Sequence, residues 1–206
     1  MKHIARVTEL AAEGPLYIFG AGPGGEINPP LIDLWADLLT RVENSRLILC
    51  NEALRLSSNR SFLRRQFAER GIGGDRLEVR AGVDREAIKL MYGEIDISLD
   101  TWPYCGGNTI AESLMSGVPV VSLLGDTFAA RYGASLLTAS GCPELVAATR
   151  ADYVDIAAAL AGDPHRLAAY RSGMRAAMQR HGFSDSARFV RDLECAFAEM
   201  LSRLPV

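Results

Sequence analysis

The segment Gly106-Gly107-Asn108-Thr109, with Glu112 shortly after it, combines residue types that can hold a nucleoside diphosphate. The two glycines let the backbone approach a ligand closely, and Asn108 is a preferred N-cap for a helix starting at Thr109. The first turn of such a helix offers amides and a positive dipole end to a diphosphate. Glu112 falls one turn further in on the same face, where its carboxylate can accept both hydroxyls of a ribose. An ordinary capped and charged helix start explains these residues equally well.

A second glycine-containing turn, Gly125-Asp126-Thr127, precedes another predicted helix near Ala129. Asp126 and Thr127 are common at an ordinary helix start, and this is the default interpretation. The turn is predicted to lie at the same edge of the sheet as the first segment. Both side chains therefore join the candidate set for the same ligand.

A third glycine segment suggests a different ligand. Gly20, Gly22 and Gly25 match the GxGxxG pattern of dinucleotide-binding proteins. That mechanism requires a helix that opens within the motif, so that its first amides meet the pyrophosphate. Here residues 26–30 intervene and include two prolines, and the acidic Glu52 after the second predicted strand is a weak signal. An NAD-binding domain is therefore a remote alternative.

The remaining reactive side chains form no recognisable catalytic or metal-binding pattern. The cysteines lack CxxC or Cys/His spacing, which predicts no metal site and reduced thiols, as in a cytoplasmic protein. Cys105, in the glycine-rich loop, is either exposed or a small unreactive loop residue. His3, His165 and His181 fall in predicted helices, where surface or packing roles are commoner than catalysis. We assign no catalytic residue and expect no cofactor.

The composition excludes two classes of partner. The 206 residues are 49% hydrophobic and 23% charged, as in ordinary globular domains. A net charge of −3 provides no basic surface for nucleic acid. No apolar run reaches the length of a membrane span, and the first residues lack the apolar core of a signal peptide. We expect a cytoplasmic protein with no nucleic-acid or membrane partner.

The elements that must position these residues follow from the hydrophobic pattern, in which short apolar runs alternate with longer amphipathic stretches. The predicted strands are residues 16–19, 46–50, 77–80, 95–99, 118–123 and 144–148. The predicted helices between them are residues 30–42, 60–70, 84–92, 109–116 and 129–138. Strands joined by helical crossovers must be parallel, and continuous apolar runs indicate a sheet covered on both faces. The predicted fold class is α/β, a Rossmann-like doubly wound parallel sheet of about six strands, with ligands at the carboxyl ends of the strands.

Beyond about residue 150 the pattern is helical only, over residues 152–161, 164–180 and 184–201. Asp163-Pro164 and Ser184-Asp185 are helix-start signals. This tail shows no hydrophobic core of its own. We therefore expect residues 150–206 to pack on the sheet, and residues 1–206 to form a single domain.

Residues 96–137 contain three ordered motifs, namely LDT-x-PY-x-GG-x-T, E-x-L-x-x-G-x-P-V-V and G-D-T-F-A-x-R-x-x-x-S-L-L. The upstream block Ile27-Asn28-Pro29 and the downstream blocks at residues 144–147 and 153–160 follow in the same order. Over about residues 15–200 the chain resembles the O-GlcNAc transferase and SPINDLY family of glycosyltransferases. The resemblance implies the C-terminal, nucleotide-sugar-binding half of a GT-B enzyme. It also implies transfer of a sugar to Ser or Thr of a protein acceptor, from a UDP-GlcNAc-like donor or, alternatively, from GDP-fucose.

The resemblance also implies roles for single residues. Gly107, Asn108 and Thr109 resemble the family's diphosphate-binding helix start, and Glu112 resembles its acidic ribose ligand. Two positions after the third predicted strand resemble those that hold the base by backbone and by a basic side chain. GT-B enzymes of this kind typically work without a metal, so none is expected. The complete candidate set is Val83, Arg85, Gly106, Gly107, Asn108, Thr109, Glu112, Asp126 and Thr127.

Three positions depart from the family pattern. Glu26 stands where the family commonly has a lysine that reaches the diphosphate, and a carboxylate there would repel phosphates. Ile88 aligns with a histidine that stacks on the base, and Met91 with a nearby arginine. These departures leave open a non-catalytic interaction module with a decayed donor site. The family's N-terminal catalytic half and TPR repeats have no counterpart here, so we expect the missing half as a partner and no activity from this chain alone.

Overall fold

The computed structural model describes residues 15–21, 27–82, 85–181, 183 and 185–203. These residues form a six-stranded parallel sheet in the order β3-β2-β1-β4-β5-β6. Its strands are β1 (Leu16–Ala21), β2 (Ser45–Asn51), β3 (Leu77–Ala81), β4 (Ile97–Asp100), β5 (Val120–Leu123) and β6 (Val146–Ala147). The predicted doubly wound parallel sheet is confirmed, and every predicted strand is present.

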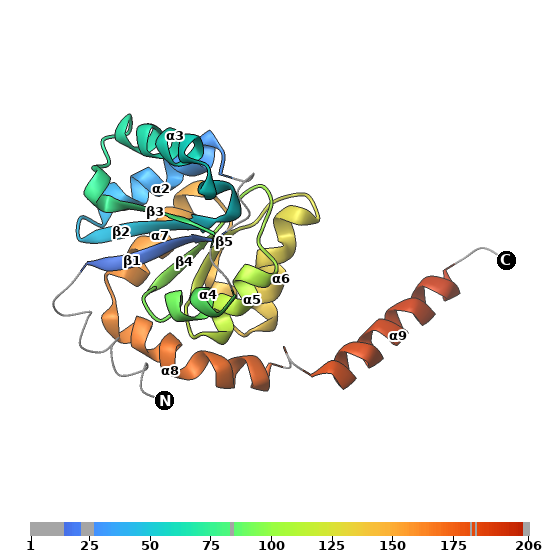
Figure 1. The fold of residues 1–206 in the computed structure, drawn as a ribbon. Coiled ribbons are helices and arrows are strands. Elements are labelled where there is room, and N and C mark those ends of the chain that lie inside the picture. The colour runs from blue at the N-terminus through green and yellow to red at the C-terminus, as the bar shows by residue number, and fades with distance from the viewer. Residues whose placement is uncertain (1–14, 22–26, 83–84, 182, 184, 204–206) are drawn as a thin grey trace.

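Helices cover both faces of this sheet (Figure 1). They are α2 (Pro29–Arg41), α3 (Ser57–Ala68), α4 (Arg85–Met91), α5 (Asn108–Met115), α6 (Tyr132–Ala139), α7 (Arg150–Ala161), α8 (Pro164–Arg180) and α9 (Ser186–Ser202). Successive residues of β1 contribute to different apolar clusters: Ile18 packs in the larger cluster with Trp35 of α2, and Phe19 packs in a smaller one with Tyr92. A strand buried on both faces needs a continuous apolar run, which is the pattern that the sequence shows.

The strand order identifies a switch point in the middle of the sheet. Sequence order runs outward from β1 to β2 and β3 on one side, and through β4, β5 and β6 on the other. The order therefore reverses between β1 and β4. In doubly wound sheets ligands bind beyond the carboxyl ends of the strands at this switch point. A ligand site is therefore expected at the segments that follow β1 and β4.

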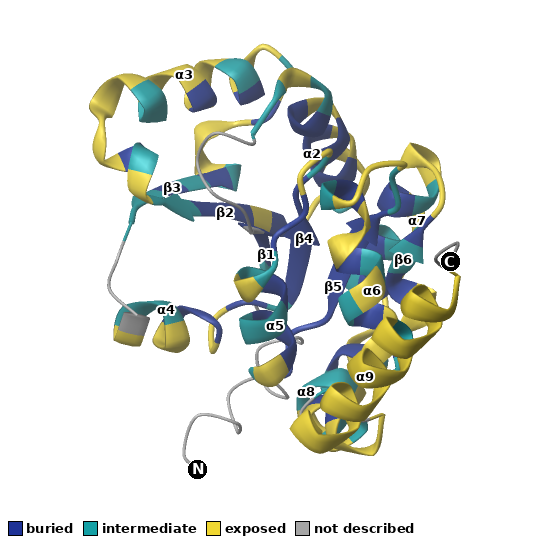
Figure 2. Ribbon diagram, turned by 90° about the vertical axis from the view of Figure 1, so that its right-hand side faces the viewer, coloured by how far each residue is buried: buried dark blue, intermediate teal, exposed yellow. Residues whose placement is uncertain are grey.

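The three C-terminal helices differ in how they pack, which corrects the prediction for residues 150–206. Helix α7 contacts β4, β5 and β6, and α8 contacts α5 and α7 while burying Leu167, Met174 and Met178. Helix α9 buries none of its residues (Figure 2) and extends away from the sheet (Figure 1). The expectation that the whole segment 150–206 packs on the sheet is therefore wrong for α9. The lack of a separate hydrophobic core in this tail predicted that it packs on the sheet, but no described part of this chain covers α9.

Candidate functional site

The start of α5 lies at the carboxyl end of β4, next to the switch point. Gly107 is the N-cap and Asn108 the first helical residue, so the helix begins one residue earlier than the sequence suggested. The first hydrogen bond into the helix runs from the amide of Ala111 to the carbonyl oxygen of Gly107 at 3.1 Å. The amides of Asn108 and Thr109 precede that ladder, as first-turn amides do. They carry the partial positive charge that favours an anion.

Gly106 has a different role from that predicted. Its amide donates to Oδ1 of Asp100 at 2.8 Å, so this amide is directed into the protein. A Cβ on Gly106 would stand 2.7 Å from Oγ1 of Thr109, closer than side chains approach, which explains the need for glycine. Gly106 therefore shapes the turn, while Gly107 and the residues after it form the surface available to a ligand.

Asp100 is the residue that the sequence reasoning missed. It ends β4 with its side chain fully buried, and Oδ2 accepts the hydroxyl of Ser122 at 2.6 Å. Burial raises the pKa of this carboxyl to about 7, and the hydrogen bonds from Ser122 and Gly106 oppose that rise. The available signal was a carboxylate at the end of an apolar run, within the LDT motif.

Thr109 lies in the first turn of α5 and Glu112 at the start of the second, and both are half-buried. The backbone oxygen of Thr109 accepts the hydroxyl of Tyr92 at 3.3 Å. Burial raises the pKa of Tyr92 to about 12, and the charge of Glu112 contributes in the same direction. Glu112 follows Asn108 by four residues, so the two lie one helical turn apart on the same face of α5.

The loop after β1 meets the loop after β4 through Asn28. Its Oδ1 accepts the amide of Leu31, which caps α2, and its Nδ2 donates to the carbonyl oxygen of Trp102 at 2.6 Å. Because α2 begins only at Pro29, its first amides come after the GxGxxG pattern and not within it. Glu52, the acidic residue weighed for a ribose, pairs instead with Arg55 at 2.5 Å. These placements argue against a dinucleotide site built on the glycine pattern, whose residues 22–25 lie outside the described ranges.

The turn after β5 lies beside the α5 start. The amide of Cys105 donates to the carbonyl oxygen of Ala129 at 3.0 Å. A Cβ on Gly107 would stand 3.7 Å from the ring of Tyr132, so the two helix starts are in contact. Asp126 and Thr127 are both exposed in this turn, and Oγ1 of Thr127 accepts the amide of Ala130 at 3.2 Å. Thr127 thus makes a local hydrogen bond of the kind expected at an ordinary helix start.

Two candidates cannot be placed against this site. Val83 lies outside the described residues, and Arg85 begins α4 with its side chain likewise undescribed. Their assignment to the base of the nucleotide stays a prediction from the family resemblance. Glu26, the departure at the diphosphate lysine, also lies outside the described residues.

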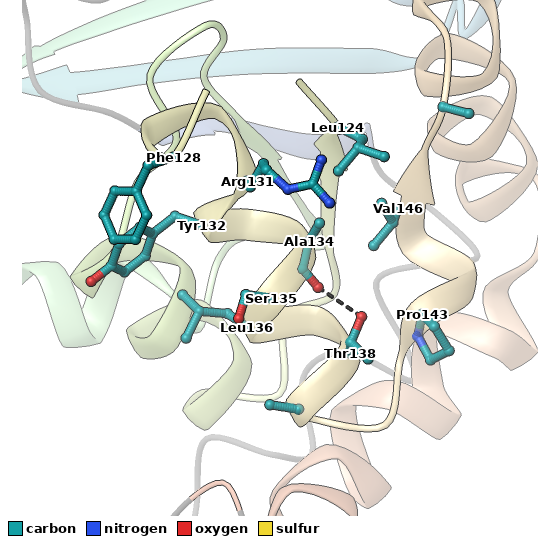
Figure 3. Close-up of a pocket in the computed structure, with 12 residues that line it drawn as sticks. Leu124, Phe128, Arg131, Tyr132, Ala134, Ser135, Leu136, Thr138, Pro143 and Val146 are labelled. Atoms are coloured by element: carbon teal, nitrogen blue, oxygen red, sulfur yellow. Dashed lines mark hydrogen bonds between the residues drawn. The ribbon is translucent and has the colours of Figure 1, made fainter. Parts of the chain in front are cut away.

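A cavity of about 1150 Å³ lies beside α6 and β6, and none of the candidate residues whose side chains are described lines it (Figure 3). Its lining is largely apolar and includes Leu124, Leu136 and Val146, with Arg131 as a cationic member. Among the described residues, its lining includes no carboxylate that could accept the hydroxyls of a ribose. The strand-end geometry, and not this cavity, therefore defines the candidate nucleotide site.

The other reactive groups do not form a site in the described residues. Cys105 is buried, not exposed, and burial followed by the charge of Asp100 raises the pKa of its thiol to about 12, which makes it unreactive. His165 and His181 belong to α8 and its C-cap. In the described ranges, no group of three or more His, Cys, Asp or Glu side chains is arranged to hold a metal ion. None of the described helices combines the length and apolar character that a membrane span needs.

A six-stranded doubly wound parallel sheet covered by helices is the Rossmann-like fold of GT-B glycosyltransferase domains. The family model of glycosyl transferase family 41 matches residues 25–193, so the chain belongs to that family. The family resemblance inferred from the motifs is confirmed.

Individual relatives agree with this assignment. The chain is 35% identical over 179 residues to the SPINDLY protein of Oryza sativa, covering 86% of this chain and 19% of that protein. It is 32% identical over 180 residues to the UDP-N-acetylglucosamine–peptide N-acetylglucosaminyltransferase of Caenorhabditis elegans, covering 86% of this chain and 15% of the relative. The chain thus spans about a fifth or less of these relatives.

The structure of a mutant of Thermobaculum terrenum O-GlcNAc transferase superimposes with a TM-score of 0.83 at 36% identity. The match covers 91% of this chain and 36% of the transferase. This chain therefore corresponds to a minor part of that solved enzyme.

Proposed function

We propose that this chain binds the nucleoside diphosphate part of a nucleotide sugar. In this proposal it is the donor-binding half of a transferase that glycosylates Ser or Thr of a protein. The observation that carries the proposal is the α5 start at the switch point, where first-turn amides follow a glycine turn and Glu112 lies within one turn. Family membership supports the same role, because the SPINDLY and C. elegans relatives carry names that specify a UDP-N-acetylglucosamine donor and a peptide acceptor.

Each part of the ligand has candidate groups. The amides of Asn108 and Thr109 would donate to the diphosphate, where the helix dipole also favours negative charge. The Glu112 carboxylate would accept the ribose hydroxyls, and Val83 and Arg85 would hold the base. Because amides and dipole supply the positive potential, we expect binding without a divalent metal.

Transfer of the sugar needs more than this chain provides. The acceptor hydroxyl must be positioned against the sugar and must lose its proton. The relatives are several times longer than this chain, and we infer that the acceptor site lies in a region corresponding to the rest of their length. We therefore expect nucleotide binding but no transferase activity from the isolated chain.

A second candidate function is an interaction module that keeps the fold and has lost the donor site. Two observations favour it. Met91 is buried at 4% exposure and Ile88 packs against the same small cluster, so both are packing residues where the family has a base-stacking histidine and a nearby arginine. Nucleotide binding separates the two functions directly.

The deciding measurement is thermal unfolding with UDP, GDP and NAD at matched concentrations, with and without EDTA. A ligand at about 100 times its Kd adds about 2.7 kcal/mol to the free energy of unfolding, which raises the midpoint by several degrees. We expect a shift with UDP that persists in EDTA and disappears in Glu112→Ala. The matched control is Glu194→Ala, which removes an exposed carboxylate from α9, far along the chain from the site.

The other outcomes assign the alternatives. A shift with GDP alone would replace the UDP sugar by a GDP-fucose-type donor. A shift with NAD alone would restore the dinucleotide interpretation. No shift with any nucleotide, in a protein that unfolds cooperatively, would favour the interaction module.

A further inference from the structure

One buried carboxylate joins the parts of the fold that meet beneath the candidate site. The side chain of Asp100 accepts the Gly106 amide on Oδ1 at 2.8 Å and the Ser122 hydroxyl on Oδ2 at 2.6 Å. The backbone oxygen of Asp100 accepts the hydroxyl of Tyr153 at 2.8 Å, and that hydroxyl in turn accepts Nε1 of Trp35 at 3.2 Å. A single residue at the end of β4 is thus tied to its following loop, to β5 and to α7, and through Tyr153 to α2.

The start of α6 packs closely against this carboxylate. A Cβ on Gly133, at the start of α6, would stand 2.4 Å from Oδ2 of Asp100 and 2.0 Å from Oγ of Ser122. The start of α6 therefore packs directly on the Asp100–Ser122 pair. Ionised carboxylates are rarely buried to this degree unless hydrogen bonds compensate for lost hydration.

The bond to Gly106 acts on the part of the loop that a ligand would meet. Gly106 is followed by Gly107, the N-cap of α5, and then by the two residues whose amides face the end of the helix. A Gly-Gly pair is the most conformationally free dipeptide of natural residues, so an unrestrained turn would sample many orientations. The hydrogen bond from Gly106 fixes one orientation before any ligand arrives, which lowers the entropy cost of binding.

We propose that Asp100 is a positioning residue for the nucleotide site. Its carboxylate, held by Ser122, fixes the Gly106-Gly107 turn so that the first amides of α5 point toward a diphosphate. Asp100 does not touch the ligand, and the inference rests on the proposed function of this site. This role accounts for the buried Asp100 carboxylate, which makes none of the proposed contacts with the nucleotide.

The ionisation of Asp100 offers a direct readout. Burial raises the pKa of Asp100 to about 7, so its charge changes within an accessible pH range. The titratable groups that act on it are Cys105 in the same loop, whose thiol pKa is raised to about 12, and Tyr153 of α7, whose pKa is raised well above its usual value. Both stay neutral below pH 9. The amide of Gly106 should therefore report the charge of Asp100 alone.

The test compares Asp100→Ala with Asp100→Asn in the full chain. The amide of Asn can still accept the Gly106 N–H on its oxygen, and its nitrogen can donate to Ser122, whereas Ala removes both bonds. UDP and GDP affinities are measured by calorimetry, and the Gly106 amide is followed by NMR on glycine-labelled protein between pH 5 and 8. We expect Asp100→Ala to weaken binding at least about tenfold and Asp100→Asn by less than about threefold. The Gly106 resonance should titrate with a midpoint near 7 in the wild type only.

The outcomes separate this inference from the proposed function. If the wild type binds neither UDP nor GDP, the proposed function fails first and the inference fails with it. If the wild type binds, and a folded Asp100→Ala variant binds equally well, only the positioning role is overturned. A Gly106 resonance that titrates unchanged in Asp100→Asn would also overturn it. If Asp100→Ala does not fold, Ser122→Ala replaces it, with an expected loss of about threefold.

Discussion

Asn28 donates its side-chain amide to the carbonyl oxygen of Trp102 at 2.6 Å, across a sequence separation of 74 residues. The two residues belong to the loops after β1 and β4, the adjacent strands between which the sheet reverses its order. The same Asn28 side chain caps α2 through its oxygen. One side chain therefore both starts a helix and joins the two loops that border the candidate site.

This double role leads to a prediction from two variants. Asn28→Asp keeps the oxygen that caps α2 but loses the donor to Trp102, and Asn28→Ala loses both. We expect Asn28→Ala to lower the free energy of unfolding by about 2 kcal/mol, of which about 1 comes from the cap. Asn28→Asp should recover the share due to the cap while still weakening nucleotide binding. Urea unfolding and UDP titration measure the two effects, and equal UDP affinity in all three proteins would contradict the predicted link between the loops.

The buried Asp100 predicts a pH dependence of stability. Its pKa is about 7 in the folded protein and about 4 when unfolded, so the folded state holds an extra proton between those values. The contribution of Asp100 to the free energy of unfolding is therefore fully present below pH 4 and is lost as the pH rises through 7. Asp100→Asn carries no charge at residue 100 at any pH. Between pH 5 and 8 the thermal unfolding midpoint of the wild type should therefore fall relative to that of this variant. Asp96, whose pKa is also raised by burial, is present in both proteins and cancels in the comparison. A constant difference across this range would show that Asp100 does not titrate there.

Two glycines in helices provide a matched pair. Gly133 begins α6 against Ser122 and Asp100, where a methyl group would overlap both side chains, whereas nothing lies within 4 Å of a Cβ on Gly173 in α8. Gly133→Ala should therefore destabilise by about 1–3 kcal/mol through overpacking. Gly173→Ala should stabilise by about 0.5–1 kcal/mol, because alanine loses less backbone entropy in a helix. Denaturant unfolding of both variants checks the opposite signs, and destabilisation by Gly173→Ala would show that α8 has a close neighbour at this position.

Much of the fold could be predicted because local patterns determine it. The buried strands are continuous apolar runs, and helix starts such as Asn28-Pro29 and Asp163-Pro164 carry their own capping residues, both of which cap in the structure. The prediction failed for α9, since a helical pattern without a core of its own does not show which surface, if any, covers the helix. Covering surfaces depend on tertiary contacts, which a periodic pattern does not encode.

The candidate site was predictable only in part, for the same reason. Glycines followed by Asn108 and Thr109 correctly indicated a helix start, to within one residue. The direction of the Gly106 amide was not predictable, because it depends on Asp100 being buried beside Ser122 of the neighbouring strand. The Asn28–Trp102 bond likewise requires knowing that β1 and β4 are neighbours. Contacts between strand ends thus follow from strand order, and the sequence motifs alone do not provide that order.

The uncovered helix α9 gives the last prediction. Its exposed apolar side chains share one helix, and the most exposed are Phe189, Met200 and Leu201. A chain ending at Phe183 loses this helix but no buried residue of it, so the free energy of unfolding should change by less than about 0.5 kcal/mol. A chain ending at Asp163 also loses α8 with three buried apolar residues, and should be destabilised by about 5 kcal/mol or more. Large exposed apolar patches promote association. Light scattering should therefore detect self-association of the full chain, and the chain that ends at Phe183 should not self-associate. A large loss of stability on removing α9 alone would show that this helix packs on its own domain in solution.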